Sequence, residues 1–539
     1  MSQRTPKANY WKDAPVAREQ LVLIPTALEE CIPVDHPVRL VDEILDRLDW
    51  KQWEAAYHGS FGQPPIHPSV MAKILLFAMI RRIRSSRSIE YHLKHSIDFI
   101  WLASGRHIDY STISEFRRKH TTELRGIFQQ MIKLAINLGI ANLSELCIDG
   151  TRVLADANKY KTWTAARLAK ALEHLDSQIA QAMETFEAND VLDQDLIGED
   201  VSADRLPAAI GDLKARREQL AGVMQSAEAM DETREKNGSK GPAQIPKTDT
   251  DARILPNKEG GYAANYTPMV TTETQGGLIV HCDVMIGNVE HDQFSMIVGC
   301  VAEDFEVDIE RAIADSAYIT GENLTIAESK SIELIGPLAE LKCADNPAIR
   351  NDLKQAVAPE HIKDLPINPQ TKRFDKSAFV YDEVADCYYC PAGKQLPHRM
   401  TEHSTYRGDK RVQRKVYTCQ ECVGCPLAAL CRKNPESKGS QPNRQGREVM
   451  HDEHEGARRR QRARMKTPEA QAAYARRQHI GELPFAVIKT MFGMRRFLLR
   501  GQEGVSQEWR WASTGFNLSK LMKHCSVTGG VLSATASTK

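Results

Sequence analysis

Two short apolar segments of the sequence end in an acid, and these acids are the first candidates for chemistry. Leu146-Cys-Ile148 leads to Asp149, and Ala312-Ile-Ala314 leads to Asp315. Both segments read as buried strands. A carboxylate at the end of such a strand costs free energy unless a cation or a donor compensates it. An Asp-Gly turn that satisfies its own backbone is the alternative for Asp149. The repetition at Asp315 favours a shared cation site.

A third acid, Glu482, lies two residues before Pro484. Because proline breaks or begins a helix, we expect Glu482 at the amino end of the helix that follows. Lys489 is nearly two turns further on and shares a face with Glu482 if the helix extends that far. Asp156 is the only serious rival acid.

Cys147 lies two residues before Asp149, so a strand places both side chains on one face. A thiol nucleophile needs a base, and no histidine is identifiable beside Cys147. We therefore expect a packed core cysteine.

Six of the twelve cysteines crowd into residues 387–431, where Cys-x-x-Cys pairs recur. Two such pairs suit one tetrahedral zinc ion, and the chain has no export signal that would favour disulfides. The alternatives are free core cysteines or a redox pair. We expect a structural zinc, in place of a core that this segment is too small to build. The expected ligands are Cys390, Cys422, Cys425 and Cys431, with Cys387 and Cys419 as substitutes.

The bulk composition describes an ordinary soluble protein, which we expect to be cytoplasmic. Lys+Arg and Asp+Glu are both 71, so any basic surface must be local. The longest apolar run, about Ile74–Ile80, is too short to span a bilayer, and no membrane partner is expected.

The amino-terminal part reads as helical, with a buried helix from Pro68 to Ile80 and another helix opening near Tyr110 with a Ser or Thr cap. Several arginines near helix ends are suited to phosphate contacts, or else form a solvated face. These are Arg84, Arg87, Arg117 and Arg118.

The middle of the chain alternates helices and strands. A helical hairpin is expected between Trp163 and about Gly238, with its turn near residues 189–204. Two antiparallel strands, a helix from His291, the Asp315 strand, a helix from Gly321 and a further strand then predict an α/β sheet. A basic run from Arg444 to Lys466 precedes the helix that carries Tyr474.

These residues together resemble the DDE transposases of bacterial insertion sequences, over nearly the whole chain. Ile148-Asp149-Gly-Thr-Arg152 and Ala314-Asp315-Ser-Ala-Tyr318 resemble the first two acid motifs. Two departures are small: Ala486 stands where Gly is usual, and Ser316-Ala317 replaces Ala-Gly. The third acid matches the Tyr-Arg-Glu-Lys signature with Tyr474, Arg477, Glu482 and Lys489.

The resemblance implies a ribonuclease-H-like mixed sheet with two insertions. Its expected organisation is a helical DNA-binding domain (1–135), core segments (140–163 and 246–345), a helical insertion (164–245), a Cys-rich zinc insertion (346–440), a basic segment with the last part of the core (441–525) and a tail (526–539).

The implied chemistry is phosphodiester transfer with two Mg²⁺ or Mn²⁺ ions. Asp149 would bridge both ions, with Asp315 on one and Glu482 on the other. Lys489 and Arg477 would steady the DNA backbone. Tyr474 would position a flipped base or the terminal phosphate.

The implied partners are the terminal inverted repeats of the element and target DNA, bound by a homodimer in the bacterial nucleoid. Two other functions stay open. One is a catalytically inactive, transposase-derived DNA-binding regulator, and the other is a nuclease of the same fold that never performs strand transfer.

Overall fold

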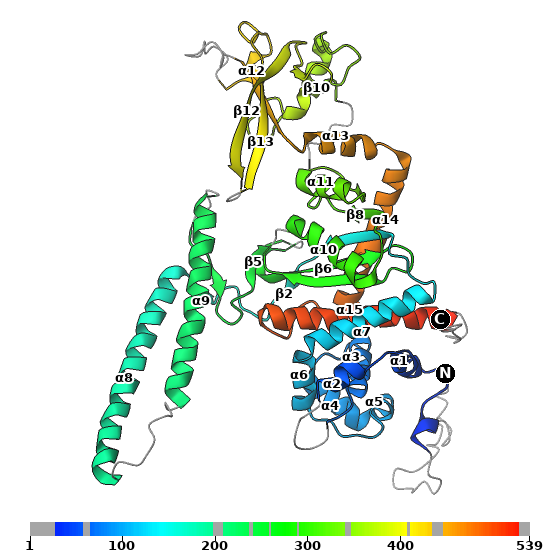
Figure 1. Cartoon of the computed structure of the whole chain (residues 1–539), viewed down its shortest axis with the longest axis vertical. Coiled ribbons are helices and arrows are strands. Elements are labelled where there is room, and N and C mark those ends of the chain that lie inside the picture. The colour runs from blue at the N-terminus through cyan, green and yellow to red at the C-terminus, as the bar shows by residue number, and fades with distance from the viewer. Residues whose placement is uncertain are drawn as a thin grey trace, which may run out of the picture. The chain divides into compact units, whose positions relative to one another are not determined.

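The computed structural model describes residues 27–57, 65–197, 208–236, 241–257, 260–287, 290–339, 346–406, 410–433 and 446–527. The chain divides into two compact units, Met1–Gln130 with Leu518–Lys539, and Met131–Asn517. Figure 1 labels their elements. Arg444, residues 198–204 of the expected hairpin turn and the tail beyond residue 527 lie outside the described residues.

The first unit is helical. It contains η1 (Leu28–Cys31), α1 (Pro37–Asp46), α2 (Lys51–Ala55), α3 (Pro68–Ile80), α4 (Ser86–His95), α5 (Ile97–Leu102), α6 (Tyr110–Arg118) and the first part of α7 (Thr121–Asn137). Helix α3 is apolar on every face and is buried along almost its whole length, as its sequence predicts. Lys73 is the one charged residue of this helix, and its ammonium lies 2.7 Å from Asp42 and 2.5 Å from Asp46. These two carboxylates compensate the buried cation.

Helix α6 is capped by Asp109, so the expectation of a Ser or Thr cap is wrong. The Asp109 carboxylate accepts hydrogen bonds from the backbone N–H groups of Ser111 (2.8 Å) and Thr112 (2.9 Å). Hydrogen bonds from the Ser111 hydroxyl and from Thr112 hold the pKa of Asp109 well below its usual range. A charged acceptor is favoured here because it also interacts with the positive end of the helix dipole.

The second unit is built on a mixed sheet. Its strands are β1 (Glu145–Gly150), β2 (Val153–Leu154), β5 (Arg253–Pro256), β6 (Tyr262–Glu273), β7 (Ile279–Met285), β8 (Arg311–Ala314) and β9 (Glu333–Ile335). Strands β7, β6 and β1 are antiparallel neighbours, while β8 and β9 continue from β1 as parallel strands. Strands β2 and β5 pair with the first part of β6. The predicted mixed α/β class is confirmed at this level.

The register of β1 and β8 determines where their terminal acids lie. Ile148 pairs with Ala314 in the parallel register. The next residue on each strand is an acid, Asp149 on one and Asp315 on the other. Because parallel strands end at the same edge of a sheet, the two carboxylates leave the sheet side by side.

Helices cover this sheet. They are η2 (Glu290–Gln293), α10 (Phe294–Phe305), α11 (Gly321–Ser329), α14 (Pro468–Ala486) and α15 (Gly501–Val527). Helix α14 contacts β1, β6 and β8. Within the second unit, the side chain of Asn517 on α15 bonds both the N–H (2.8 Å) and the C=O (2.7 Å) of Ile279. Trp509 on the same helix donates to the carbonyl of Met269 at 3.1 Å. These bonds attach α15 to β6 and β7.

Pro484 lies inside α14, so the prediction that Glu482 begins a helix is wrong. The helix continues to Ala486 and passes into η6 (Val487–Met491), a π-helical turn. A proline removes one backbone hydrogen bond and crowds the preceding turn, and an adjacent π-helical turn can absorb that irregularity. Pro484 and Phe485 are both buried, so packing outweighs the local preference to end the helix here.

Two insertions interrupt this core. The first is the predicted helical hairpin, α8 (Ala165–Ile197) and α9 (Ala208–Lys236), which pack through Leu168, Val223 and Ala227. A two-stranded sheet, β3 (Thr162–Trp163) and β4 (Ile245–Pro246), joins its two ends.

The second insertion forms an antiparallel sheet. Its elements are η3 (Pro359–Asp364), η4 (Lys376–Ala378), β10 (Val380–Asp382), β11 (Cys387–Tyr389), β12 (Gln395–Tyr406), β13 (Lys410–Thr418), α12 (Ala428–Cys431) and β14 (Glu448–Asp452). The strands pair in order from β10 to β14, so the sheet includes residues beyond 440. Tyr388, Leu396 and Tyr417 are among its buried core residues.

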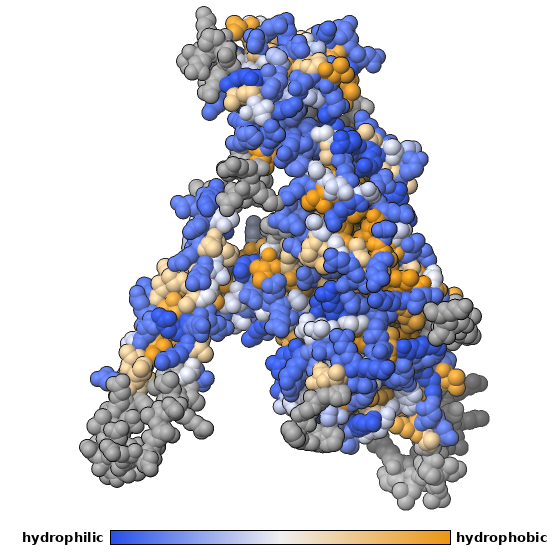
Figure 2. Space-filling model, viewed as in Figure 1, coloured by the Kyte–Doolittle hydropathy of each residue, from blue (hydrophilic) through white to orange (hydrophobic). Residues whose placement is uncertain are grey.

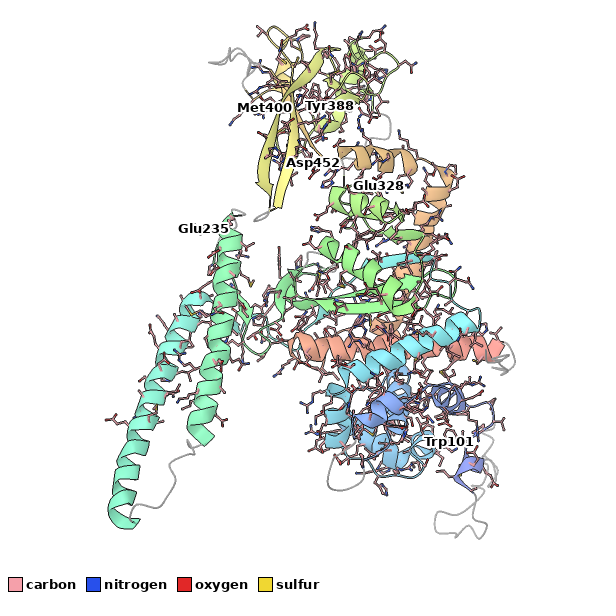
Figure 3. The ribbon with its side chains drawn as sticks, viewed as in Figure 1. Trp101, Glu235, Glu328, Tyr388, Met400 and Asp452 are labelled. Carbon is pink, nitrogen blue, oxygen red and sulfur yellow. The ribbon has the colours of Figure 1, made fainter. Side chains whose placement is uncertain are left out.

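The arginines of α13 (Glu455–Arg464) are paired with acids of the same unit. Arg458 forms a two-point ion pair with Asp452 at 2.6 and 2.8 Å, and Arg460 does the same with Glu328 at 2.9 and 2.6 Å. Figure 3 labels Asp452 and Glu328, which lie on the two elements that flank α13. The basic run of the sequence is therefore, in this helix, largely an internal ion-pair network.

Hydrophilic residues cover most of the face of the molecule that Figure 2 shows. Among the described residues, no helix combines the length and the apolar character needed to cross a membrane.

Replacing the cap of α6 tests its role. We expect Asp109→Ala to destabilise α6 by about 1 kcal/mol, because two backbone N–H groups lose their acceptor. The measurement is amide hydrogen exchange of a peptide covering residues 110–118, which should accelerate roughly five-fold. Asp109→Asn, which keeps an acceptor, is the matched control and should change exchange less. Equal exchange in both variants would contradict the assignment.

Candidate active site

Asp149 and Asp315 share one cation. The Arg477 guanidinium, which α14 supplies, lies 3.0 Å from Asp149 Oδ1 and 3.9 Å from Asp315 Oδ2. Backbone N–H groups also donate to these carboxylates, from Gly150 to Asp149 (2.8 Å) and from Ala317 to Asp315 (2.9 Å). Asp149 is only 6% exposed, so this compensation is what makes its charge tolerable. Burial opposes the charge of Arg477, but Asp149 and Asp315 outweigh it and raise the pKa of Arg477.

Gly481 allows α14 to approach β1 closely. A Cβ atom at this position would lie 3.0 Å from Cys147 Sγ and 3.3 Å from Asp149 Oδ2. Glu482 is the next residue, and its side chain is exposed. Because neighbouring Cα atoms are about 3.8 Å apart, the backbone of Glu482 lies beside Asp149. Folding thus brings the backbone of Glu482 close to Asp149, although the two positions are 333 residues apart in the sequence.

Two other residues of the signature lie on the same segment. Lys489, in η6, donates from Nζ to Thr151 Oγ1 at 2.5 Å, two residues beyond Asp149. Tyr474, on α14, is half-buried against an apolar cluster that includes Ile313 and Ile335 of the neighbouring strands. Lys489 is therefore positioned at the end of β1, and the ring of Tyr474 packs onto β8 and β9.

Glu290 is a fourth carboxylate at this edge of the sheet, and sequence reasoning missed it. Its Oε1 lies 3.1 Å from Arg152, and its Oε2 lies 2.6 Å from the position of a Cβ on Gly150. Burial raises the pKa of Glu290, Arg152 opposes this, and the charges of Asp315 and Asp149 add to it. No strand pattern leads to Glu290. The nearest signal was Gly150, because a residue without a side chain permits the carboxylate to approach.

Two rivals at the site are explained by their contacts. Cys147 is fully buried, and burial raises the pKa of its thiol to about 12, so it is a core residue as expected and not a nucleophile. Asp156 forms an ion pair with Arg500 at 2.7 Å, away from the three candidate acids.

Five of the six clustered cysteines line one pocket of about 20 Å³, which has room for about one small atom. They are Cys390, Cys419, Cys422, Cys425 and Cys431, so all four expected ligands and one substitute are present. Cys387 lies on β11 and does not line this pocket. All six are free thiols in the structure.

The environment of these thiols favours a thiolate at one position. A hydrogen bond from Cys419 lowers the pKa of Cys422 to about 6, and Arg447 adds a backbone N–H at 3.4 Å. Burial raises the pKa of Cys431 to about 12.

Neither the candidate acids nor the clustered thiols are closed around an ion. Among the described residues, no three His, Cys, Asp or Glu side chains converge closely enough to hold a metal ion as they stand.

The four arginines of the first unit differ in exposure. Arg117 is buried and donates to the carbonyl of Arg84 at 2.6 Å. Arg87 and Arg118 are exposed, and the Arg87 guanidinium lies 5.0 Å from the ring centre of Tyr110. Arg87 and Arg118 are thus the more accessible cations of the set.

The ion pair of Glu290 can be tested without reference to activity. We expect Arg152→Ala to destabilise the Glu290 segment by roughly 2–4 kcal/mol, because it leaves a buried carboxylate without its cation. Glu290→Gln in the same background should recover more than half of this loss. Hydrogen exchange of residues 290–305 measures both. Additive effects of the two substitutions would contradict the pairing.

Comparison with known proteins agrees with the resemblance described above. Residues 389–522 match the family model of the transposase DDE domain, and residues 26–119 match that of a transposase domain (DUF772). No curated protein matches the chain. One similar solved structure is the cryo-EM structure of the piggyBac transposase synaptic complex with hairpin DNA. Its alignment has 10% sequence identity, covers 93% of this chain and 77% of that chain, and has a TM-score of 0.32. The two family matches support a DDE transposase of the insertion-sequence type.

Proposed function

We propose that this transposase binds the terminal inverted repeats of a bacterial insertion sequence, cleaves the DNA there and joins the freed 3′-hydroxyls to target DNA. The observation that carries the proposal is the pair of carboxylates, Asp149 and Asp315, that end neighbouring parallel strands. The packing of Gly481 against Asp149 puts the backbone of the next residue, Glu482, nearby, which supports its proposal as the third acid. The proposal includes a ribonuclease-H-like core, which the order β7-β6-β1-β8-β9 supports.

The three acids are proposed to hold two Mg²⁺ or Mn²⁺ ions. Oxygen ligands suit these ions, and the two strand-end carboxylates already attract a cation, Arg477. Asp149 would contact both ions, with Asp315 on one and Glu482 on the other. When bound, such ions activate the attacking oxygen and stabilise the leaving oxygen of a phosphodiester.

The cations around the acids are assigned to the DNA backbone. Lys489 is held at the end of β1 by Thr151, where its ammonium can meet a phosphate next to the cut. Arg477 lies between the carboxylates of Asp149 and Asp315 and is proposed to contact DNA from that position. Tyr474, whose ring packs onto β8 and β9, is proposed to position a flipped base or the terminal phosphate.

The helical first unit is proposed to recognise the element ends. Arg87 and Arg118 are its exposed candidates for phosphate contacts. Arg84 and Arg117 are proposed to support them, because the side chain of Arg117 donates to the backbone carbonyl of Arg84. Pairing two ends requires at least two copies of the chain, so the proposed assembly is a homodimer on DNA.

The Cys-rich insertion is proposed to hold one structural zinc ion. Five thiols line a pocket of atomic size, and cysteine sulfur is a donor that structural zinc sites prefer. The lowered pKa of Cys422 favours its thiolate form. The ligands are assigned to Cys390, Cys422, Cys425 and Cys431, with Cys419 as the substitute.

Substitution of the acids tests the catalytic proposal. We expect Asp149→Asn and Glu482→Gln to reduce metal-dependent nicking of a duplex carrying the element ends by roughly a thousand-fold or more, because each removes a charged ligand. Binding of the same duplex should persist in both variants.

Asp308→Asn is the matched control, since Asp308 is an exposed acid before β8, and it should cut normally. If the Asp149 and Glu482 variants cut as well as the wild type, the assignment is wrong. If the wild type binds ends but never nicks them, the inactive regulator is the better description. If pre-cleaved ends fail to join target DNA, the protein is better described as a nuclease that does not perform strand transfer.

Metal analysis tests the zinc proposal. We expect about one zinc per chain in the purified protein, and its loss in Cys422→Ser and Cys425→Ser. Cys31→Ser, which removes an exposed thiol of the first unit, should retain the metal. Protein without zinc whose six clustered thiols all titrate freely would remove the proposal.

A further inference from the structure

A second pocket, separate from the three acids, lies along the same sheet. It has a volume of about 600 Å³, and its lining includes Asp156, Lys159, Lys161, Tyr262, Arg496 and Arg500. Neither the metal chemistry nor the zinc proposal uses any of these residues.

Backbone pairing holds the pocket walls together. Leu154 at the end of β2 forms a parallel bridge with Arg496, and Phe497 donates to the carbonyl of Leu154 at 2.9 Å. On the other side, Ala155 donates to the carbonyl of Ala264 on β6 at 2.9 Å. Segments that are more than three hundred residues apart in the sequence thus meet at β2, and the pocket is part of the folded core.

The charge of the lining is strongly positive. Among the described residues of the lining, Asp156 is the one acid, and it forms an ion pair with Arg500 at 2.7 Å. Counted over these described residues, Lys159, Lys161, Arg496 and Arg500 carry four positive charges against that one negative charge, in a protein whose total charge is zero. A concave site lined by one sign of charge concentrates ligands of the opposite sign.

An exposed aromatic ring belongs to the same lining. Tyr262, at the start of β6, is 61% exposed. Gly260 and Gly261 precede it with φ angles of +95° and +73°, so this turn is one that glycine adopts readily. An exposed tyrosine beside cations is a surface on which a nucleic-acid base can stack.

Strand β6 gives the distance between the pocket and the acids. Asp149 pairs with Val270 and Leu154 pairs with Asn265 on this one strand. Five residues of an antiparallel strand span about 17 Å at roughly 3.4 Å per residue. The pocket therefore begins about 17 Å from Asp149, within reach of the same DNA molecule.

We infer that this pocket binds an unpaired nucleotide of the DNA on which the enzyme acts, with Tyr262 under the base and Lys159, Lys161 and Arg496 on the backbone phosphates. The inference rests on the proposed function for its DNA partner. A duplex presents its bases only in its grooves, which protruding elements enter. A concave pocket of this size instead suits a nucleotide that has left the stack.

Salt-dependent binding tests the cationic part. Wild type and the Lys159→Ala/Lys161→Ala variant are compared on a fluorescent duplex with a single-stranded overhang and on its blunt counterpart. The variant should lose about 1.4 from the slope of log affinity against log salt on the overhang DNA, because single strands contribute roughly 0.7 per phosphate contact. The blunt duplex should be unaffected. Lys330→Ala/Lys363→Ala removes two exposed charges elsewhere in the unit and is the matched control.

Fluorescence of 2-aminopurine in the overhang tests the stacking. Its emission should be quenched on binding to wild type and to Tyr262→Phe, but not to Tyr262→Ala, which should also bind the overhang DNA roughly ten-fold more weakly. Because Tyr262 is exposed, neither substitution removes a core contact.

Each remaining outcome overturns something definite. Equal losses on overhang and blunt DNA would show that the pocket holds duplex backbone and would refute the unpaired nucleotide. Unchanged slopes and quenching in all variants, with normal wild-type binding, would refute the pocket alone. Wild-type protein that binds neither DNA would refute the proposed function together with the inference.

Discussion

The second unit depends on the neutralisation of two carboxylates at the edge of its sheet. Parallel pairing of β1 with β8 places the buried Asp149 beside the partly exposed Asp315, and two like charges on neighbouring strand ends repel each other. Arg477 offsets this repulsion from α14, and the glycine at residue 481 eases the close approach of that helix, because a Cβ there would lie tightly against Cys147 and Asp149. Strand register, helix packing and charge compensation are therefore one constraint. Glu290 with Arg152 extends the same balance to a fourth acid.

Charge is distributed unevenly in a chain whose net charge is zero. The arginines of α13 are engaged by carboxylates such as Asp452 and Glu328, so that helix holds neighbouring elements together. The pocket beside β2 has the opposite balance, since its described lining residues include one acid and four cations. A run of basic residues in a sequence thus indicates neither a binding surface nor its absence. Whether a basic run forms a binding surface depends on where the acids lie, and folding sets those positions.

The Cys-rich insertion combines a small apolar core with thiols. Tyr388, Leu396 and Tyr417 pack in the same cluster as Cys390, Cys419, Cys422 and Cys431. Gly446 follows a strict steric demand, because a Cβ there would lie 1.5 Å from the carbonyl oxygen of Cys419. A sheet of this size buries little apolar surface, so thiols gathered at one point are where a bound ion would contribute most to stability.

By itself, the sequence determined the features that depend on neighbouring residues. Apolar segments ending in acids predicted β1 and β8, and helical composition predicted α3 and the α8–α9 hairpin, because such patterns reflect local periodicity. The spacing of the cysteines likewise predicted that they would gather. The Asp109 cap of α6 rests on local contacts with Ser111 and Thr112. Only the tertiary structure decided that Pro484 lies within α14 and that Glu290 joins the acids. Both reflect a competition between local preference and contacts made by folding, whose free energy depends on residues far away in the sequence.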